Sequence, residues 1–428
     1  MEFTGKEFTE QLHPLSASKD LDPLIERVVN ARIVLLGEAS HGTHEYYTWR
    51  AAITKRLVRE KGFNVIAVEG DWPDCYRINR YIKGYEDTHK SPQEVLRTFN
   101  RWPTWMWANW EMVALTSWLK IFNEIATPGK KVGFYGLDVY SLWESMEALL
   151  KYLRTTDPPV AKMAEEALRC FSAYGKNEKR YAMNAMSNSC KKEVVRLLKA
   201  IRSKAMYYNH DPEAMLNTTQ NAFVISEAEN YYRSMVEFDD ETWNIRDTHM
   251  MATLKRLIDF HGPKSKVIVW EHNTHIGDAR YTDMRNIGMV NTGQLARAEF
   301  GEEACVLVGF GSYSGSVIAG GAWGAPMEEM EVPPARPGSI EEQLHNESPK
   351  NRLLLFNDEF TAARYSKIIP HRAIGVVYDP KHEHHNYVPS FMARRYDAFI
   401  YLDRTTAVHP LHVAPDLGQV PETYPFEF

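Results

Sequence analysis

The sequence predicts an α/β fold, with a parallel sheet flanked by helices, a large helical insertion and a smaller C-terminal α+β region. Three observations predict it. Short apolar runs rich in β-branched residues alternate with helical stretches, as buried parallel strands do. Residues 141–260 are helical in pattern almost throughout, which is too long for one crossover between adjacent strands. A stretch rich in glycine and proline, residues 309–337, precedes further strand-like runs.

Residues 1–140 are interpreted as the first half of the α/β core. A leader helix is expected within residues 1–30, because leucine, isoleucine and valine recur there at helical spacing. Gly62 is expected to end the first long helix. The core strands are predicted at about 32–36, 64–68 and 131–136, and the long helices at Thr43–Lys61 and Trp107–Ala126.

Residues 141–262 are interpreted as a helical insertion that packs beside the sheet or caps it. Its clearest helices are predicted at Ser141–Leu153, Lys191–Ile201, Met215–Met235 and Ile245–Phe260. Residues 263–310 then return to the α/β core. Two further strands are predicted there, at about 266–270 and at Cys305–Val308.

Residues 311–428 are expected to form the smaller C-terminal α+β region. Gly309–Pro337 is predicted to form an extended loop or a small β-structured segment outside the main sheet. Three later apolar runs either belong to this region or complete the main sheet: Leu353–Phe356, Ile374–Tyr378 and Ala398–Leu402.

Composition excludes several classes of protein. The 428 residues carry 50 basic and 56 acidic side chains, a net charge of −6, which argues against a nucleic-acid partner. The N-terminus has no apolar signal core and no run approaches membrane-spanning length. Four cysteines without a C-x-x-C pair favour a reducing cytoplasm and support neither a disulfide framework nor a thiolate zinc site. The oligomeric state stays open.

Four of the predicted strands end in acidic residues or histidines. In open α/β sheets, ligands bind beyond the carboxyl ends of the strands, so these segments are expected to line one rim as an active site. The segments are Gly37-Glu38-Ala39-Ser40-His41, Glu69-Gly70-Asp71, Gly136-Leu137-Asp138 and Glu271-His272-Asn273-Thr274-His275.

Glu38 and His41 lie three residues apart at a strand-to-helix junction. A carboxylate beside an imidazole favours one tautomer and stabilises the imidazolium, as a general base requires. Helix capping by Ser40 or Thr43, with an incidental histidine nearby, accounts for the same residues equally well.

The other candidates also have structural interpretations. Glu69 is either solvated at the rim or held by a cation inside a cleft. Asp138 is better explained as a turn residue or as the cap of the next helix. Function is favoured for His272 and His275, because a dense polar cluster directly after a buried strand needs partners and the two rings can share one face.

Arg246 and Trp105 are candidates for substrate binding. Arg246 would bind a substrate oxyanion, or else form a surface ion pair with Asp247. Trp105 belongs to a tryptophan-rich stretch that forms either core or the wall of a hydrophobic pocket. The run His382-Glu383-His384-His385 is expected to be solvated rather than metal-binding, and His249 to be core or surface.

Several catalytic signatures are absent from the sequence. It has no G-x-S-x-G nucleophile elbow, no H-E-x-x-H zinc motif, no Walker A loop and no G-x-G-x-x-G fingerprint. A covalent serine or cysteine route therefore lacks its usual signature. Direct attack by an activated water becomes the leading hydrolytic option.

The four strand-end segments together resemble the erythromycin esterase family, as do Gly311-Ser312-Tyr313, Gly375-Val376-Val377-Tyr378 and Asn386-Tyr387-Val388-Pro389. The resemblance implies an α/β fold with a helical subdomain and a large cleft. Family members that confer antibiotic resistance hydrolyse the macrolide lactone ester without a required metal. By motif, His41 resembles the family's general base and Glu38 its orienting acid, while Glu69, His272, His275 and Arg246 resemble other cleft residues.

Two segments look closer to uncharacterised relatives of the family, some of which are labelled as succinoglycan biosynthesis proteins. They are Asp278-Ala279-Arg280 and Gly320-Gly321-Ala322-Trp323-Gly324.

The function expected is metal-independent hydrolysis of a small-molecule ester or lactone, with no cofactor. His41, Glu38, Glu69 and His272 are the predicted catalytic residues, and the predicted substrate contacts are His275, Arg246, Trp105 and Asp138. One alternative is a metallohydrolase with Glu38, His41, Glu69 and His272 as ligands. Another is a saccharide-binding or biosynthesis accessory protein.

Overall fold

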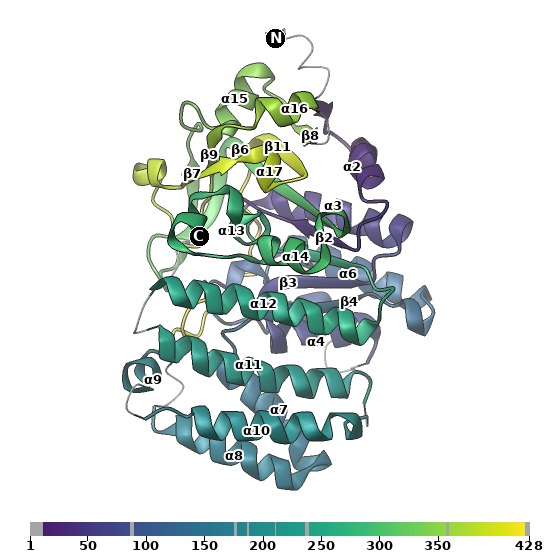
Figure 1. The fold of residues 1–428 in the computed structure, drawn as a ribbon, viewed down its shortest axis with the longest axis vertical. Helices are drawn as coiled ribbons and strands as arrows, with labels where there is room; N and C mark the ends of the chain where they lie inside the picture. The colour runs from purple at the N-terminus through teal and green to yellow at the C-terminus, as the bar shows by residue number, and fades with distance from the viewer. Residues whose placement is uncertain are drawn as a thin grey trace.

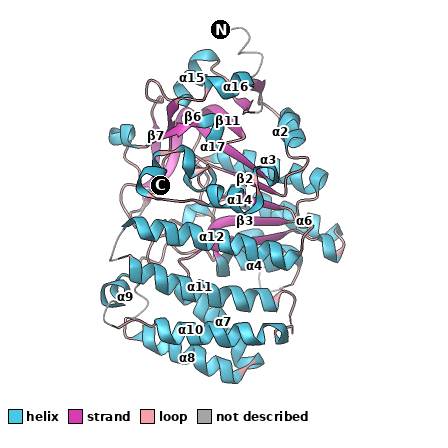
Figure 2. Cartoon of the chain, in the orientation of Figure 1, coloured by secondary structure: helices cyan, strands magenta, loops and turns pink. Residues whose placement is uncertain are grey.

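The computed structural model describes residues 12–85, 90–174, 178–185, 188–209, 211–235, 239–356 and 359–423. They form a mixed α/β fold around a nine-stranded, mostly parallel sheet (Figures 1 and 2), which confirms the predicted fold class. The strand order is β1-β8-β11-β6-β2-β5-β3-β4, with β7 paired to β6. A separate two-stranded antiparallel sheet joins β9 and β10.

The strands of the main sheet are β1 (His13–Pro14), β2 (Ile33–Leu36), β3 (Val65–Asp71), β4 (Gly133–Asp138), β5 (Val267–Trp270), β6 (Cys305–Gly320), β7 (Met327–Val332), β8 (Arg352–Leu355) and β11 (Ala398–Thr405). The small sheet contains β9 (Ile368–Arg372) and β10 (Tyr387–Phe391).

The helices of the first half are α2 (Asp22–Arg27), α3 (His44–Lys61), α4 (Trp72–Lys83), α5 (Pro92–Leu96) and α6 (Trp110–Ile125). The central run contains α7 (Leu142–Thr156), α8 (Pro158–Ser172), α9 (Glu178–Ala185), α10 (Lys191–Lys204), α11 (Ala214–Ser234) and α12 (Asp239–His261). The later helices are α13 (Asn273–Ile276), α14 (Thr292–Phe300), α15 (Ile340–Glu347), α16 (Glu359–Arg364) and α17 (Met392–Arg395).

The strands in the centre of the sheet are apolar along their whole length because both faces are covered. Val34 and Leu36 of β2 pack into the core that includes α3 and α6. Ile33 and Leu35 point to the opposite core, which includes α12 and α14. This two-sided burial is the reason that the strands appear as continuous apolar runs rather than alternating ones.

Three expectations for single elements need correction. Ile374–Tyr378 is not a strand: it makes only isolated bridges, at Ile374 and Val377, and the strand of that region is β9. β6 continues well past Val308, because its second half pairs with β7 on one side and β11 on the other. Of the expected leader helix, residues 1–11 lie outside the described residues, and the rest forms a 3₁₀ turn and the short α2.

The C-terminal strands divide between the two possibilities that the sequence leaves open. β11 pairs in parallel with β6 and antiparallel with β8, so both strands extend the main sheet. β9 and β10 pair with each other, and β10 makes one further isolated bridge, between Ser390 and Thr282.

Helices α7 to α11 stack beside the sheet in the lower half of Figure 1 and share a hydrophobic core of their own. α12 lies between this stack and the sheet, contacting α11 on one side and β4 on the other. None of the described helices has both the length and the apolar character needed to cross a membrane.

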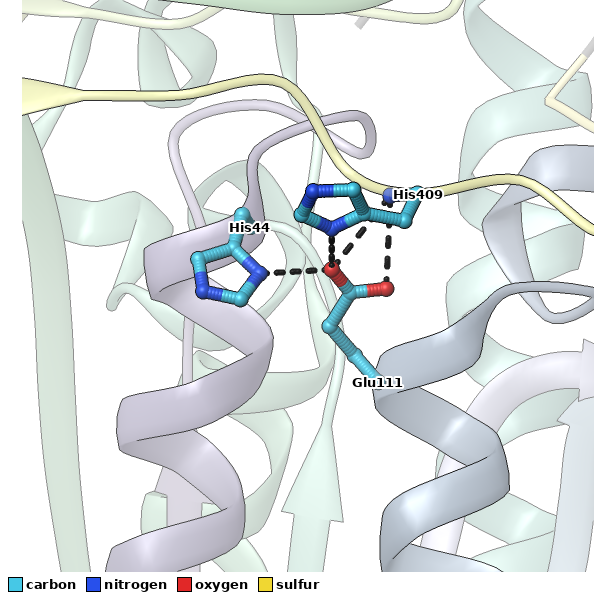
Figure 3. Close-up of side chains that lie close together, drawn as sticks. All are labelled: His44, Glu111 and His409. Carbon is cyan, nitrogen blue, oxygen red and sulfur yellow. Dashed lines mark hydrogen bonds and ion pairs between the residues drawn. The ribbon is translucent and has the colours of Figure 1, made fainter.

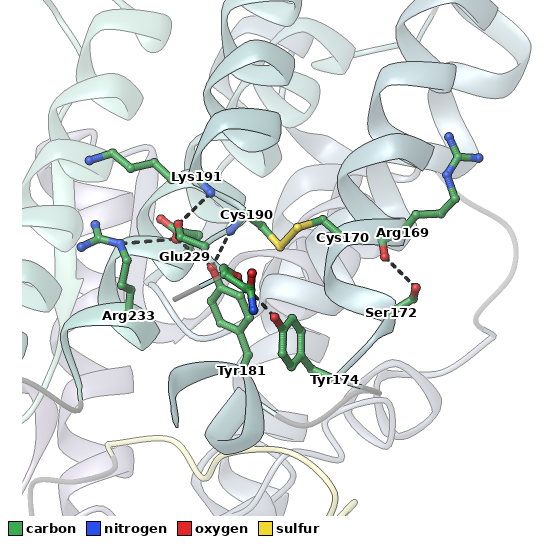
Figure 4. The surroundings of a disulfide bond; sticks show 11 residues. Arg169, Cys170, Ser172, Tyr174, Tyr181, Cys190, Lys191, Glu229 and Arg233 are labelled. Atoms are coloured by element: carbon green, nitrogen blue, oxygen red, sulfur yellow. Dashed lines mark hydrogen bonds and ion pairs between the residues drawn. A yellow bond between two sulfur atoms is a disulfide. The ribbon is translucent and has the colours of Figure 1, made fainter. Parts of the chain in front are cut away.

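A disulfide joins Cys170 in the last turn of α8 to Cys190 directly before α10 (Figure 4). The other two cysteines, Cys75 and Cys305, are buried free thiols. The expectation that the cysteines give no disulfide is therefore wrong, and the cysteine argument for a reducing compartment fails with it. Sequence spacing gave no signal, because α8 and α10 are brought together by packing within the insertion.

We expect loss of this disulfide to destabilise the insertion by about 3 kcal/mol, because the bond closes a loop of 20 residues. The melting temperature of the wild type should fall in reductant, whereas a Cys170→Ala, Cys190→Ala double variant should melt lower and not respond. Denatured, unreduced protein should titrate two free thiols. Four free thiols in carefully oxidised protein would contradict the prediction.

Candidate active site

Four parallel strands place the predicted residues along one edge of the sheet. β2, β5, β3 and β4 are consecutive neighbours and run in the same direction, so their carboxyl ends meet. Arg246 reaches this edge from α12. The predicted residues at these strands are Glu38 and His41 after β2, His272 and His275 after β5, Glu69 in β3 and Asp138 at the end of β4.

His41 is held by a carboxylate that is itself held by an arginine. Nδ1 of His41 lies 2.9 Å from Oε1 of Glu38, and the guanidinium of Arg50 donates to Oε2 of the same carboxylate. All three side chains are buried. Since an ionised carboxylate only accepts, Nδ1 of His41 donates the hydrogen, and in the neutral ring Nε2 then carries the lone pair. Among the described residues Nε2 has no hydrogen-bond partner, so it is available as a base.

The loop that carries His41 is fixed by close backbone contacts. Gly42 accepts hydrogen bonds at its carbonyl from the N–H groups of Ile318 and Val408, at 3.0 and 2.9 Å. A side chain at position 42 would collide with the backbone of Ile318, so only glycine fits there.

His272 lies beside His41, with ring centroids 5.0 Å apart. Its Nδ1 accepts from the backbone N–H of Thr274 at 3.4 Å and lies 2.9 Å from that residue's hydroxyl. Burial lowers the pKa of His272 well below its usual value, so the ring is neutral. With Nδ1 accepting, the hydrogen is on Nε2, which has no partner within the described part of the chain. A neutral N–H donor thus lies close to a basic nitrogen.

Arg246 is a fully buried cation that joins three groups of the site. It donates to both carboxylate oxygens of Asp138 at 3.0 and 2.7 Å and to Oε1 of Glu69 at 2.7 Å. Oε2 of Glu69 in turn accepts the backbone N–H of His272 at 2.7 Å. Burial alone would raise the pKa of Glu69, but the positive charges of His275 and Arg246 hold it well below its usual value. Glu69 therefore stays ionised and fixes the backbone of His272.

His275 is buried in the same network. Its Nδ1–H donates to the Asp247 carboxylate at 2.9 and 3.0 Å, and its Nε2 lies 3.4 Å from Glu69. Nε2 also lies 2.9 Å from Nη1 of Arg246, a contact in which the arginine can only donate. Burial alone would lower its pKa, but the carboxylates of Asp247 and Glu69 raise it to about 10. The ring stacks on Trp243, with centroids 4.6 Å apart. Both ring nitrogens are therefore engaged inside the protein.

Glu271 is buried next to this network without a charge partner. Neither of its carboxyl oxygens has a hydrogen-bond partner among the residues that the structure describes. Burial raises the pKa of Glu271 well above its usual value, so the group is a neutral carboxylic acid.

The structure separates the open alternatives for several residues. Thr43 is the N-cap residue of α3, but within the described residues neither its side chain nor that of Ser40 caps the helix; the two hydroxyls bond to each other. The capping role favoured for Asp138 is wrong, since α7 begins at Leu142 after Ser141 and the Asp138 carboxylate binds Arg246. The alternative of a surface ion pair for Arg246 is wrong as well, because the side chain is buried.

Trp105 is core. It packs edge-to-face on Trp102 at 5.3 Å, and its indole nitrogen has no hydrogen-bond partner in the described part of the chain. Trp107, from the same tryptophan-rich stretch, reaches the sheet edge and donates to the backbone carbonyl of Glu69 at 3.1 Å. His249 is buried, as a core residue is expected to be.

The histidine run at residues 382–385 is mainly exposed, as expected. Its one buried member, Glu383, bonds to Arg372 at 2.6 Å and to the hydroxyl of Tyr378 at 2.5 Å.

The sequence analysis missed Arg50, and it assigned no role in the site to Asp247 or Glu271. Arg50 had a signal: it lies four residues after Tyr46 and three before Ile53, on the buried stripe of α3. A charged residue at such a position needs a buried partner, which is Glu38. Its guanidinium also lies over the rings of Tyr47 and Trp270, at 4.7 and 4.6 Å from their centroids. Glu271 gave no signal beyond its position after β5.

The fold and this edge define an α/β protein with a buried site of histidines, carboxylates and arginines. The sequence model of the erythromycin esterase family matches residues 58–405, so the chain belongs to the erythromycin esterase family. The matched range begins after Glu38, His41 and Arg50, so the family match does not include these residues.

The names of two similar proteins support a hydrolase activity for this family member. The chain is 24% identical over 283 residues to the Bacillus subtilis (strain 168) protein named Putative hydrolase YbfO, covering 61% of each protein. It is 21% identical over 379 residues to erythromycin esterase type II of Escherichia coli, covering 81% of this chain and 85% of the relative.

Solved structures share the fold. One is a succinoglycan biosynthesis protein, with a TM-score of 0.77 at 20% identity over 95% of this chain and 97% of the other. Another is a mutant of the erythromycin esterase EreC in its open conformation, with a TM-score of 0.69 at 19% identity over 94% of this chain and 97% of the other. At these identities the likeness shows the fold alone.

We expect Arg246→Met to destabilise the protein by about 3–5 kcal/mol, because it leaves the buried carboxylates of Glu69 and Asp138 without their cation. Arg154→Met is the matched control: Arg154 pairs with Glu165 at 3.2 Å on an exposed surface, and its loss should cost less than about 1 kcal/mol. Urea unfolding of the three proteins measures the difference. Equal losses in the two variants would contradict the buried network.

Proposed function

We propose that the protein is a metal-independent hydrolase of an ester or lactone in which His41 activates a water molecule. One observation carries the proposal. The free Nε2 of His41 lies next to a second histidine, His272, whose Nε2–H is also unpartnered among the described residues. A base and a neutral hydrogen-bond donor side by side are the two groups that direct attack of water on a carbonyl requires.

His41 acts as the general base. Nε2 accepts a proton from water as the water oxygen attacks the carbonyl carbon, and Glu38 stabilises the resulting imidazolium through Nδ1–H. Arg50 keeps the Glu38 carboxylate in place throughout. The imidazolium then returns its proton to the leaving alkoxide, so that the acid and the alcohol are the products.

His272 supplies a hydrogen bond to the oxyanion. A neutral imidazole is suited to this role because it donates without titrating near neutral pH. Glu69 positions His272 through its backbone N–H, and Arg246 holds Glu69. His275 and Asp138 contact Arg246 and so help to position it. We therefore treat Glu69, Arg246, His275 and Asp138 as positioning residues.

Substrate needs an opening movement to enter. His41 and His272 are fully buried. The relative EreC is known in an open conformation, which supports a family in which such a site opens. Closure over the bound substrate would exclude bulk water and so strengthen the electrostatic interactions inside the site.

The charge pairing supports catalysis without a metal. Both carboxylates of the alternative metal site, Glu38 and Glu69, are already neutralised by buried arginines. A divalent cation there would have to displace Arg50 or Arg246. The name of the Escherichia coli relative makes a macrolide one substrate to test, along with simple esters.

His41→Ala should lower kcat by about 10²–10⁴-fold, the usual contribution of a general base. The assay is hydrolysis of p-nitrophenyl esters and macrolides, with circular dichroism and melting temperature confirming the fold. His382→Ala is the matched control. His382 is exposed and lies outside the strand-end segments that form the site, so this variant should keep full activity.

Two results would contradict the proposal. One is a folded His41→Ala protein with most of its activity. The other is wild-type activity that disappears on chelation and returns only with added metal, which would favour a metallohydrolase. No turnover of any ester together with saturable saccharide binding would favour the binding-protein alternative instead.

His272→Ala should lower kcat by about 10²–10³-fold, the cost of losing one oxyanion donor, with a smaller change in KM. His272→Gln, which retains an N–H donor, should recover part of the loss. Steady-state kinetics on the best ester measures both variants. If the two variants were equally active, His272 would not donate to the oxyanion.

A further inference from the structure

Three side chains of the kinds that bind metal ions meet at the surface (Figure 3). His44 begins α3, Glu111 lies in the first turn of α6 and His409 comes from the C-terminal segment. Both imidazoles point their Nδ1 atoms at Oε1 of Glu111, His44 at 2.5 Å and His409 at 2.6 Å. Three elements far apart in sequence thus converge on one oxygen atom.

This trio stands out from the other polar clusters of the protein. Within the described residues it is the one group of three His, Cys, Asp or Glu side chains whose ligand atoms all lie within 4.8 Å of one another. The Glu111 side chain is 4% exposed, whereas His44 and His409 are 33% and 62% exposed. A buried anion is therefore covered by two imidazoles that solvent can reach.

We propose that His44, Glu111 and His409 bind a divalent transition-metal ion of the zinc type. Two imidazole nitrogens and one carboxylate oxygen are ligands that zinc prefers. Three protein ligands leave the fourth tetrahedral position to water or a small ligand. Space exists for that position, because the trio lines a pocket of about 270 Å³ together with Thr48, Lys55 and Trp110.

Metal binding requires both imidazoles to move away from Glu111. Tetrahedral zinc bonds of about 2.0–2.1 Å place neighbouring ligand atoms about 3.3 Å apart, whereas the two nitrogens lie 2.5 and 2.6 Å from Oε1 of Glu111. The ion takes the place of the hydrogens that now lie between nitrogen and oxygen, and each neutral imidazole then carries its proton on Nε2. His409 is the most exposed of the three and is the ligand best able to adjust.

The position of the site gives it a structural role. The N–H of His44 donates to the carbonyl of Thr406, and the N–H of Trp110 donates to the carbonyl of His409, both at 2.9 Å. Val408 bonds to Gly42, next to His41. A bound ion would fasten the C-terminal segment to α6 and to the start of α3, which directly follows the loop that carries His41. This proposal does not depend on the proposed hydrolase function.

The test uses the full-length chain after chelation and removal of the chelator. Zinc chloride titrated by calorimetry should bind at one saturable site per chain, and the melting temperature should rise with zinc concentration. Cobalt(II) bound in its place should show the visible absorption of tetrahedral coordination. Loss of a group that only hydrogen-bonds to a metal ligand costs about 10–100-fold in affinity. Because His409 would bind the ion directly, His409→Ala should weaken zinc binding by more than this.

The matched control is a His382→Ala, His385→Ala double variant, which removes two exposed histidines elsewhere and should bind zinc as the wild type does. Since His409 is exposed, its replacement should leave the fold intact, and Glu111→Gln provides a second variant. No saturable binding would overturn the proposal, as would binding that survives His409→Ala. Loss of binding only in the double control variant would assign the ion to the histidine run instead.

Discussion

The site depends on the hydrogen bond between Glu38 and His41. This contact sets the tautomer of the imidazole, because a carboxylate accepts and so leaves the hydrogen on Nδ1. Arg50 is the reason that the carboxylate tolerates complete burial, since it donates to the other oxygen. The remaining features at the edge, including the neutral His272, matter to the chemistry only if Nε2 of His41 is free to take a proton.

The two sides of the site are built in the same way. On one side Arg50 holds Glu38, which orients His41; on the other Arg246 holds Glu69, which orients His272 through its backbone. In each case a buried cation fixes a carboxylate and the carboxylate fixes a histidine. Buried pairs of this kind contribute little net stability against an apolar core of equal volume. We interpret these ion pairs as serving to hold the two imidazoles rigidly in the protein interior rather than to stabilise the fold.

Much of the fold was predictable from sequence, because the central strands are buried on both faces and therefore appear as uninterrupted apolar runs. The same feature placed Glu38, Glu69, Asp138 and His272 at one edge, since parallel strands align their carboxyl ends. Other features depend on tertiary packing and could not be predicted from the sequence. The second half of β6 is glycine- and serine-rich and forms a strand only because β7 and β11 pair with it. Asp138 looked like a cap because its partner, Arg246, lies 108 residues away.

The most direct test of the account is the tautomer of His41 in the resting protein. Nitrogen NMR of protein labelled with ¹⁵N-histidine, assigned by the signals missing from His41→Ala, distinguishes a protonated from an unprotonated ring nitrogen. We predict a neutral His41 ring with hydrogen on Nδ1 and an unprotonated Nε2, and a changed spectrum in Glu38→Gln. A ring with its hydrogen on Nε2, unchanged by Glu38→Gln, would contradict it.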